Sequence, residues 1–197
     1  MPKHLLVTGS SGIAAAVVRM AATSGMDVTF VGIDATEVAE LANETATTGH
    51  VCDLRDETAV EGLFNSLSGV TDVIHVAGGS GRSFGDGPLT GVRLDAWKQT
   101  FDLNLTTAFL VTREAVRMFE TNNAKGSITL TGTALAFHPE PDRFATAAYM
   151  ASKSAFVGLV NHTASKYAEM GIRVNAVRPG LIETEIHASG GLPDRVN

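Results

Sequence analysis

Short apolar runs rich in β-branched residues alternate with longer segments of helical periodicity, and this alternation restricts the possible folds most. The apolar runs lie at 4–8, 27–33, 49–52, 71–76, 126–131 and 172–177, and the helical segments at roughly 12–24, 36–46, 56–67, 94–121 and 147–170. Strands separated by helices are joined by right-handed crossovers and form a parallel sheet with helices on both faces. The sequence therefore predicts one α/β domain over residues 1–197, a doubly wound parallel sheet in three layers, α/β/α.

Composition indicates which classes of binding partner and which cellular compartment to expect. The formal charge of −6 argues against nucleic-acid and anionic-membrane binding, since both depend on clustered basic residues. The single cysteine, Cys52, cannot form an internal disulfide, which is typical of a reducing compartment. The chain begins without a charged segment followed by a long apolar one, and its apolar runs are too short to cross a bilayer. We therefore expect a cytoplasmic protein with no membrane partner.

The first apolar run leads into the stretch "VTGSSGIAAAV", which has the features of a phosphate-binding loop. Gly9 can adopt a positive φ where the chain leaves the strand. Gly12 lacks a Cβ, so the backbone can approach a pyrophosphate at the N-terminus of the next helix. Ala14 and Ala15 are small enough for that helix to pack close to the sheet. The alternative is an ordinary tight turn. The residues predicted to bind a dinucleotide in this Rossmann-type loop are Gly9, Ser11, Gly12 and Ile13.

Asp34 ends the second apolar run, in the stretch "VTFVGIDA", about 20 residues beyond the glycine loop. An acidic residue at that place can hydrogen-bond the adenine ribose. No Arg or Lys lies between Gly9 and Val18 to balance a 2′-phosphate. These observations favour NAD over NADP as the cofactor, without excluding NADP. Asp34 could equally be the N-cap of the next helix.

Tyr149 and Lys153 are four residues apart in a predicted helix, so their side chains share one face. A positive charge about 5 Å from a phenol contributes roughly 3 kcal/mol at an effective dielectric constant of about 20. The pKa of Tyr149 is therefore predicted to fall by roughly two units. Such a tyrosine can serve as a general acid–base group in a carbonyl–alcohol proton transfer. The alternative is a chance pair on a solvated helix.

The chain resembles the short-chain dehydrogenase/reductase family. The resemblance rests on the stretches "VTGSSGI", "CDL", "VAG", "FDLNL", "GSITLTGT", "YMASKSA" and "GIRVNAVRPGLIET", in the family's order. It implies an NAD(P)-dependent oxidoreductase that interconverts a secondary alcohol and a ketone by hydride transfer. It also implies a small-molecule substrate and a homodimer or homotetramer.

The resemblance implies four catalytic residues. Tyr149 would be the acid–base group, and Lys153 would hold the nicotinamide ribose and lower the pKa of the tyrosine. Asn104 would hold a water that links Lys153 to a proton relay. Thr133 takes the place of the family's serine and would orient the substrate carbonyl, with Thr131 as a rival candidate.

The resemblance also implies further contacts with the cofactor. These would come from residues that follow the third, fourth and sixth strands. Asp53 and Leu54 would contact adenine, Ala77 and Gly78 the adenosine ribose, and Pro179, Gly180, Ile182 and Thr184 the nicotinamide. No metal site is expected.

Two motifs depart from the family's single-domain members. Only Ser10 and Ser11 separate the first two glycines, and the fourth strand ends "IHVAG" where those members have Asn-Asn-Ala-Gly. Both features resemble a longer branch of sugar-nucleotide epimerases and dehydratases, so such an activity is one alternative. A non-catalytic NAD-binding or interaction module is another. The longer downstream motifs favour the dehydrogenases. We expect His75 to be a packing or hydrogen-bonding residue at the end of a strand.

The C-terminal end and two loops concern the substrate. The chain ends at Asn197, partway into the family's substrate lid, so the rest of the lid, a helix and a last strand are expected to be absent. The Gly/Pro-rich stretches "GGSGRSFGDGPLT" and "AFHPEPDRFATAA" follow the fourth and fifth strands. They are candidates for the walls of a substrate pocket, or for ordinary solvent loops.

Overall fold

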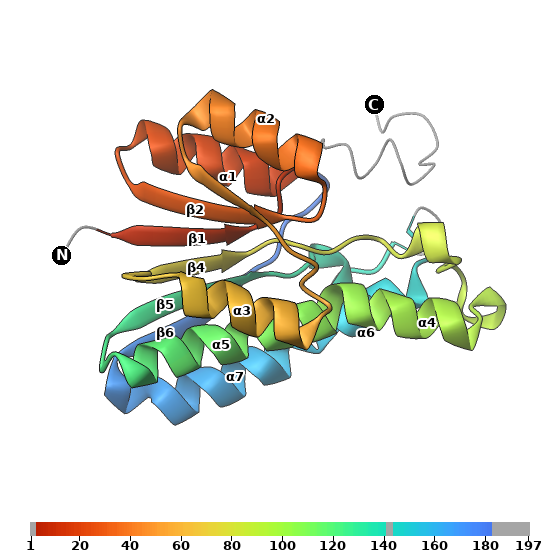
Figure 1. The fold of residues 1–197 in the computed structure, drawn as a ribbon. Helices are drawn as coiled ribbons and strands as arrows, with labels where there is room; N and C mark the ends of the chain where they lie inside the picture. The colour runs from red at the N-terminus through yellow and green to blue at the C-terminus, as the bar shows by residue number, and fades with distance from the viewer. Residues whose placement is uncertain (1–2, 141–143, 183–197) are drawn as a thin grey trace.

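A parallel sheet forms the centre of the computed structural model, which describes residues 3–140 and 144–182 (Figure 1). The strands are β1 (His4–Thr8), β2 (Asp27–Gly32), β3 (Thr48–Val51), β4 (Asp72–His75), β5 (Gly126–Thr131) and β6 (Ile172–Val177). Their order across the sheet is β3-β2-β1-β4-β5-β6, and all paired neighbours are parallel. The predicted doubly wound sheet is confirmed, and each predicted apolar run forms a strand.

The helices cover both faces of the sheet. They are α1 (Gly12–Thr23), α2 (Ala35–Thr45), α3 (Glu57–Ser66), α4 (Leu94–Phe101), α5 (Thr107–Thr121), α6 (Ala147–Ser154) and α7 (Phe156–Tyr167). Figure 1 shows α1 and α2 on one face and α3, α5 and α7 on the other. The helix predicted over 94–121 is divided by a π-helical turn at Asp102–Thr106, and the helix predicted over 147–170 is divided between α6 and α7.

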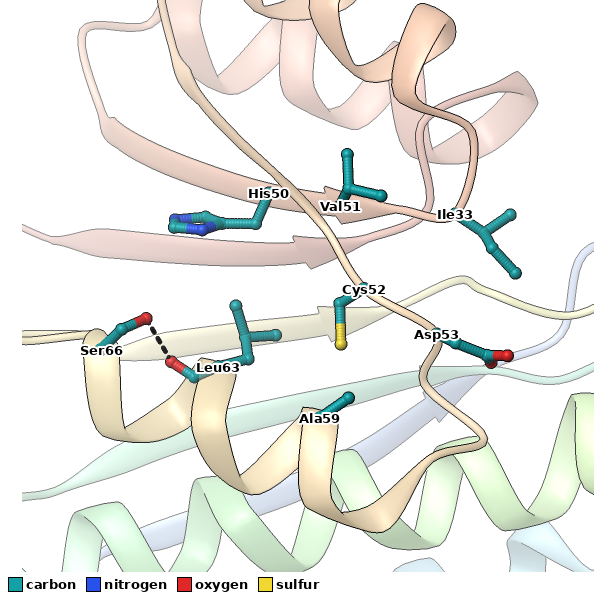
Figure 2. Close-up of a pocket in the computed structure, with 8 residues that line it drawn as sticks. All are labelled: Ile33, His50, Val51, Cys52, Asp53, Ala59, Leu63 and Ser66. Atoms are coloured by element: carbon teal, nitrogen blue, oxygen red, sulfur yellow. Dashed lines mark hydrogen bonds between the residues drawn. The ribbon is translucent and has the colours of Figure 1, made fainter.

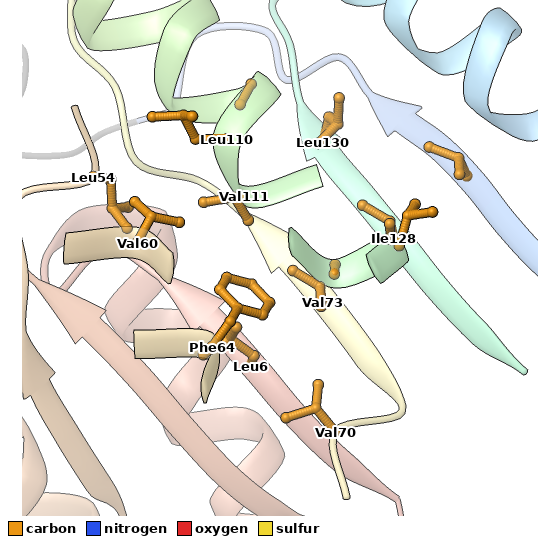
Figure 3. Close-up of a cluster of buried hydrophobic side chains, with 14 of the residues drawn as sticks. Leu6, Leu54, Val60, Phe64, Val70, Val73, Leu110, Val111, Ile128 and Leu130 are labelled. Atoms are coloured by element: carbon orange, nitrogen blue, oxygen red, sulfur yellow. The ribbon is translucent and has the colours of Figure 1, made fainter. Parts of the chain in front are cut away.

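Two apolar clusters hold these layers together. Leu5 and Val7 of β1 pack with α1 and α2 on one face, whereas Leu6 between them packs on the other. Alternate residues of a strand point to opposite faces, so β1 contributes to both clusters. The larger cluster lies between the sheet and the helices α3 and α5, and Figure 3 shows Phe64 of α3 and Val111 of α5 within it. Both faces of the central strands are therefore buried beneath helices, as expected for a parallel sheet.

The strand order reverses between β1 and β4. Chain connections leave β1 toward β2 on one side, and β4 lies on its other side. Since all strands are parallel, the loops that follow them meet along one edge of the sheet. In doubly wound sheets, ligands bind beyond this edge at the point of reversal. The predicted site residues that follow these strands therefore lie along a common edge.

Candidate active site

The glycine loop between β1 and α1 has the predicted backbone geometry. Gly9 has a φ of +111° and Gly12 a φ of +52°, a region that disfavours residues with a side chain. A Cβ on Gly9 would lie 2.7 Å from the Cβ of Ala14, so α1 packs closely on the strand end. In the described part of the chain, the Ser11 side chain makes no capping hydrogen bond to α1. The N–H groups at the start of α1 are therefore left to a ligand or to solvent.

Asp34 is the N-cap of α2, which is one of the two roles that the sequence left open for it. Its Oδ1 accepts hydrogen bonds from the backbone N–H groups of Thr36 at 2.8 Å and Glu37 at 3.0 Å. Asp34 remains exposed while it caps α2, so the cap does not exclude a contact with the adenine ribose.

A second carboxylate reaches the glycine loop, and sequence reasoning missed it. The Ser10 hydroxyl donates to Oε2 of Glu37 at 2.7 Å, which ties the loop to the first turn of α2. A Cβ on Gly32 would lie 2.5 Å from the Ser10 oxygen, so the absence of a side chain at position 32 admits this contact. The only signal in the sequence was the spacing that places Glu37 in the first turn of a helix after Asp34.

An open cavity of about 470 Å³ lies between β3, the segment that follows it and α3, and Ile33 after β2 borders it (Figure 2). Its lining includes Ile33, Cys52 and Asp53. The Asp53 carboxylate accepts from the Arg55 guanidinium at 2.9 and 2.7 Å, and this pairing lowers the pKa of Asp53. Leu54 contributes its side chain to the core (Figure 3), so of the predicted adenine pair only Asp53 lines the cavity.

Thr8 anchors the end of β4 to β1. Its hydroxyl oxygen accepts from the backbone N–H groups of Val76 at 3.0 Å and Ala77 at 3.2 Å. It lies 2.9 Å from Nδ1 of His75, and since it already accepts two N–H groups, we assign its proton to that nitrogen. Nε2 of His75 then faces the Thr107 hydroxyl at 3.5 Å. The His75 side chain is fully buried, which confirms its expected packing and hydrogen-bonding role.

His75 is expected to make the fold sensitive to acid. Burial, with a smaller contribution from the charge of Lys153, lowers the pKa of His75 to about 3. Below pH about 6.5 the unfolded chain binds a proton that the folded protein excludes. The contribution of His75 to the free energy of unfolding is therefore complete above that pH. It falls by up to about 1.4 kcal/mol per pH unit as the pH drops toward 3. Urea unfolding between pH 7 and 4.5 measures this slope.

Two variants test the assignment of the slope. His75→Asn lacks the titrating ring and is expected to lose stability less steeply with acid than the wild type does. His162→Gln removes an exposed histidine of α7 and is expected to keep the wild-type slope. An unchanged slope in His75→Asn would contradict the prediction.

Gly78, after β4, brings the backbone close to two predicted catalytic residues. A Cβ at this position would lie 2.5 Å from Oδ1 of Asn104 and 3.2 Å from Nζ of Lys153. Asn104 sits in the π-helical turn with no exposed surface, and its amide clamps Gly79 by accepting from the N–H at 3.1 Å and donating to the carbonyl at 2.9 Å. Its amide also donates to the carbonyl of Thr100 at 2.9 Å, within the turn. π-Helical turns of this kind often occur at functional sites.

The structure brings Tyr149, Lys153 and Thr133 together beside the end of β5. The Thr133 hydroxyl lies close enough to the Tyr149 hydroxyl to favour the ionised phenol and lower its pKa. The Lys153 ammonium is buried and donates to the carbonyl of Thr131 at 2.8 Å. Of the two rival threonines, Thr133 thus offers its hydroxyl to the tyrosine, whereas Thr131 offers its backbone carbonyl to the lysine.

The predicted fall in the pKa of Tyr149 is wrong. Burial raises the pKa of Tyr149, and the neighbouring Thr133 hydroxyl only partly opposes this effect. Burial also lowers the pKa of Lys153 to about 7, so near neutral pH its positive charge is only partly present. The prediction treated both groups as partly solvated, whereas the helix faces the interior, where the charged forms of both lose hydration.

The chain after β6 completes the edge of the sheet. The Pro179 carbonyl accepts from the N–H of Ala134, which joins this segment to the loop after β5 at 2.9 Å. Gly180 has open space where a Cβ would lie, and Ile182 is exposed. Thr184 lies outside the described residues. A cavity of about 140 Å³ at this end includes Thr133 and Lys153 in its lining.

Other classes of site receive no support from the described residues. Within the ranges 3–140 and 144–182, no helix is long and apolar enough to cross a bilayer. In the same ranges, no three His, Cys, Asp or Glu side chains gather in a way that could hold a metal ion.

Comparisons with known proteins agree on one family. A family model described as Enoyl-(Acyl carrier protein) reductase matches residues 7–196. The 2,5-dichloro-2,5-cyclohexadiene-1,4-diol dehydrogenase of Sphingobium indicum is 31% identical, with 92% of this chain and 73% of that protein covered. The 3beta-hydroxysteroid dehydrogenase of Mediterraneibacter gnavus is 32% identical, with 93% and 67% covered. A solved short-chain type dehydrogenase/reductase from Mycobacterium ulcerans has a TM-score of 0.86 and 28% identity, with 95% and 70% covered.

The sheet order and the residues along its edge define a Rossmann-type oxidoreductase that depends on NAD(P). The chain belongs to the short-chain dehydrogenase/reductase family. As in its dehydrogenase relatives, the reaction is an oxidoreduction at CH–OH groups.

Proposed function

We propose that the protein interconverts a secondary alcohol and a ketone with NAD, and that Tyr149 transfers the proton. This proposal rests on the contact between the Tyr149 and Thr133 hydroxyls. Thr133 lies two residues after Thr131, whose carbonyl binds Lys153. It gathers a proton donor, a carbonyl-orienting hydroxyl and a cation at the end of β5. General acid–base catalysis requires such groups within hydrogen-bonding reach of the reacting oxygen.

The residues along the edge fit a nicotinamide dinucleotide. The start of α1 offers N–H groups beside Gly12, where a pyrophosphate would bind. Exposed Ile33 and the cavity beside Asp53 suit an adenine ring. The absence of a side chain at Gly78 lets the backbone pack closely against Asn104 and Lys153, and the nicotinamide ribose would lie beside this contact. Asp34, Ala77, Pro179 and Ile182 border this path at the ends of β2, β4 and β6.

Each catalytic side chain has one task in the proposed reaction. The nicotinamide cofactor supplies the hydride chemistry when bound. In the reducing direction, the Thr133 hydroxyl orients the substrate carbonyl, and Tyr149 donates its phenolic proton to that oxygen. In the oxidising direction, the tyrosine takes the proton back. Lys153 holds the ribose through its ammonium group, and Asn104 holds the segment at Gly79 in place.

The charge beside the glycine loop favours NAD over NADP. The Glu37 carboxylate lies on the Ser10 hydroxyl, at the loop where a 2′-phosphate of NADP would approach, and Asp34 lies three residues earlier. Arg55, the cation near this end, is paired with Asp53. Two like charges about 5 Å apart repel each other by roughly 1 to 3 kcal/mol at the dielectric constants of a protein surface.

Glu37→Gln is expected to raise the affinity for NADPH about tenfold relative to that for NADH, since it removes the negative charge and keeps a partner for Ser10. Fluorescence titration of both reduced cofactors measures the ratio. Glu40→Gln, on the same helix but without the contact to Ser10, is the matched control and should keep the wild-type ratio. If Asp34→Asn changes the ratio and Glu37→Gln does not, the discriminating residue is Asp34.

Binding and turnover together test the proposed function. NADH titration is expected to show saturable binding, and a panel of ketones and secondary alcohols is expected to show net oxidation or reduction of the cofactor. Tight binding without turnover would favour a non-catalytic module. Retained NAD with no net change in its redox state would favour an epimerase or dehydratase.

A further inference from the structure

A buried carboxylate from the loop after β4 lies against the start of α6. Asp86 is only 7% exposed. Its Oδ1 accepts from the N–H of Gly87 at 2.9 Å and of Ala148 at 3.0 Å, and its Oδ2 accepts from the N–H of Tyr149 at 2.8 Å. A residue 63 positions earlier in the chain therefore holds the backbone of the proposed acid–base residue directly.

The sequence next to α6 does not provide this cap. In the described residues, Thr146 at the N-cap position makes no side-chain hydrogen bond to the helix, and its hydroxyl points to the Phe144 carbonyl. The N–H of Ala147 donates instead to the carbonyl of Gly87 at 3.0 Å. Asp86 and Gly87 thus accept hydrogen bonds from three consecutive N–H groups at the start of the helix. Without them these donors would lose their partners, which is most costly at the buried Ala148.

Asp86 is itself fixed in the fold. Its backbone N–H donates to the carbonyl of Gly81 at 3.1 Å, which closes the loop upon itself. Gly81 has a φ of +71°, and a Cβ there would collide with the Thr100 side chain of α4. Helix α4 packs beside α6. The loop is therefore held between the two helices and can transmit a fixed position to the start of α6.

We infer that Asp86 is the positioning residue for Tyr149: its carboxylate fixes the first turn of α6 so that the phenol meets Thr133. This inference rests on the proposed function, because it assigns Asp86 a purpose in that reaction. The helix N-terminus carries partial positive charge, which suits a carboxylate cap in a buried place. A shift of about 1 Å at a catalytic group can cost roughly a hundredfold in rate. The sequence predicted that this loop borders the substrate pocket or faces solvent. In the structure it supports the helix that carries Tyr149.

Asp86→Ala is expected to lower kcat about ten- to a hundredfold. The KM for NADH is expected to change less than kcat, since the proposed pyrophosphate and adenine contacts come from the glycine loop and the segment after β3 and not from α6. Amide hydrogen exchange at Ala148 and Tyr149 is expected to accelerate selectively. Asp86→Asn keeps the shape and one acceptor oxygen, so it is expected to recover part of kcat and to fold if the alanine variant does not.

Asp56→Ala is the matched control. Asp56 caps α3 by accepting from the N–H of Ala59 at 3.1 Å, so its loss removes a similar cap from a helix that carries no catalytic residue. The inference is overturned if the amides of Ala148 and Tyr149 stay protected in Asp86→Ala, or if kcat falls no further than in Asp56→Ala. An inactive wild type would refute the proposed function, whereas the exchange of these two amides would still decide whether Asp86 holds α6.

Discussion

Tyr149→Phe is expected to lower kcat by about 10²- to 10⁴-fold, the contribution typical of a positioned general acid–base group. The substitution removes the hydroxyl that meets Thr133 and keeps the ring that fills the same buried place. Cofactor affinity is expected to stay close to the wild-type value, since the phosphate and adenine contacts lie elsewhere along the edge. Single-turnover rates and NADH titration measure the two effects separately.

The chain's other tyrosine is the matched control for this experiment. Tyr167, near the end of α7, is expected to tolerate phenylalanine with no loss of turnover. Absorbance titration adds a check that does not depend on activity. Because burial raises the pKa of Tyr149, the tyrosine signal lost in Tyr149→Phe should be one that titrates above the ordinary range. Turnover of Tyr149→Phe within tenfold of the wild type would exclude the assigned proton transfer.

Lys153→Met is expected to change stability and activity in opposite directions. Hydrogen bonds to charged groups contribute about 1.5–3 kcal/mol, so loss of the ammonium should weaken NAD binding by about ten- to a hundredfold and lower kcat as well. In the protein without added cofactor, however, the ammonium is buried, and burial lowers its pKa from 10.5 to about 7. Methionine fills a similar volume without that cost, so the variant is expected to be the more stable protein at pH 7.

The pH dependence of this gain has a definite sign. Between pH 7 and 10.5 the unfolded wild type binds a proton at Lys153 that the folded protein lacks, so wild-type stability rises with pH in that window. Lys153→Met has no such titration. Its advantage in urea unfolding should therefore be greatest near pH 7 and below, and should shrink toward pH 10. Lys166→Met, at an exposed site on α7, controls for loss of charge. An advantage that does not vary with pH would contradict the assigned burial.

Periodicity and glycine chemistry were sufficient to predict the sheet. The apolar runs became strands because both faces of a parallel sheet are buried, and Gly9 took the left-handed turn because other residues adopt it at a cost. The periodicity over 94–121 predicted one helix, whereas the structure divides it at a π-helical turn. Within this turn Asn104 bonds to Gly79, 25 residues away, a contact that periodicity does not report.

The features that were missed depend on contacts between distant segments. Glu37 reaches Ser10 across 27 positions, and Asp86 reaches Tyr149 across 63. No local pattern encodes either contact, because each follows from the arrangement of the strand ends along one edge. The direction of the Tyr149 pKa was missed for a related reason. Burial is a property of the packed helix, whereas the spacing of Tyr149 and Lys153 reports only that they share a face.

The Thr8 hydroxyl constrains how this sequence can diverge. One oxygen at the end of the central strand serves two N–H groups of the neighbouring segment and the ring of His75. Valine has almost the same shape but no hydroxyl, so it would leave Nδ1 of the buried His75 without its partner. The N–H groups of Val76 and Ala77 would keep only the Thr8 backbone carbonyl as acceptor. Replacement of Thr8 by an aliphatic residue is therefore expected to be destabilising. Serine keeps the oxygen and remains an accessible neighbour in sequence space. Positions 8 and 75 should therefore change together among descendants of this chain, if they change at all.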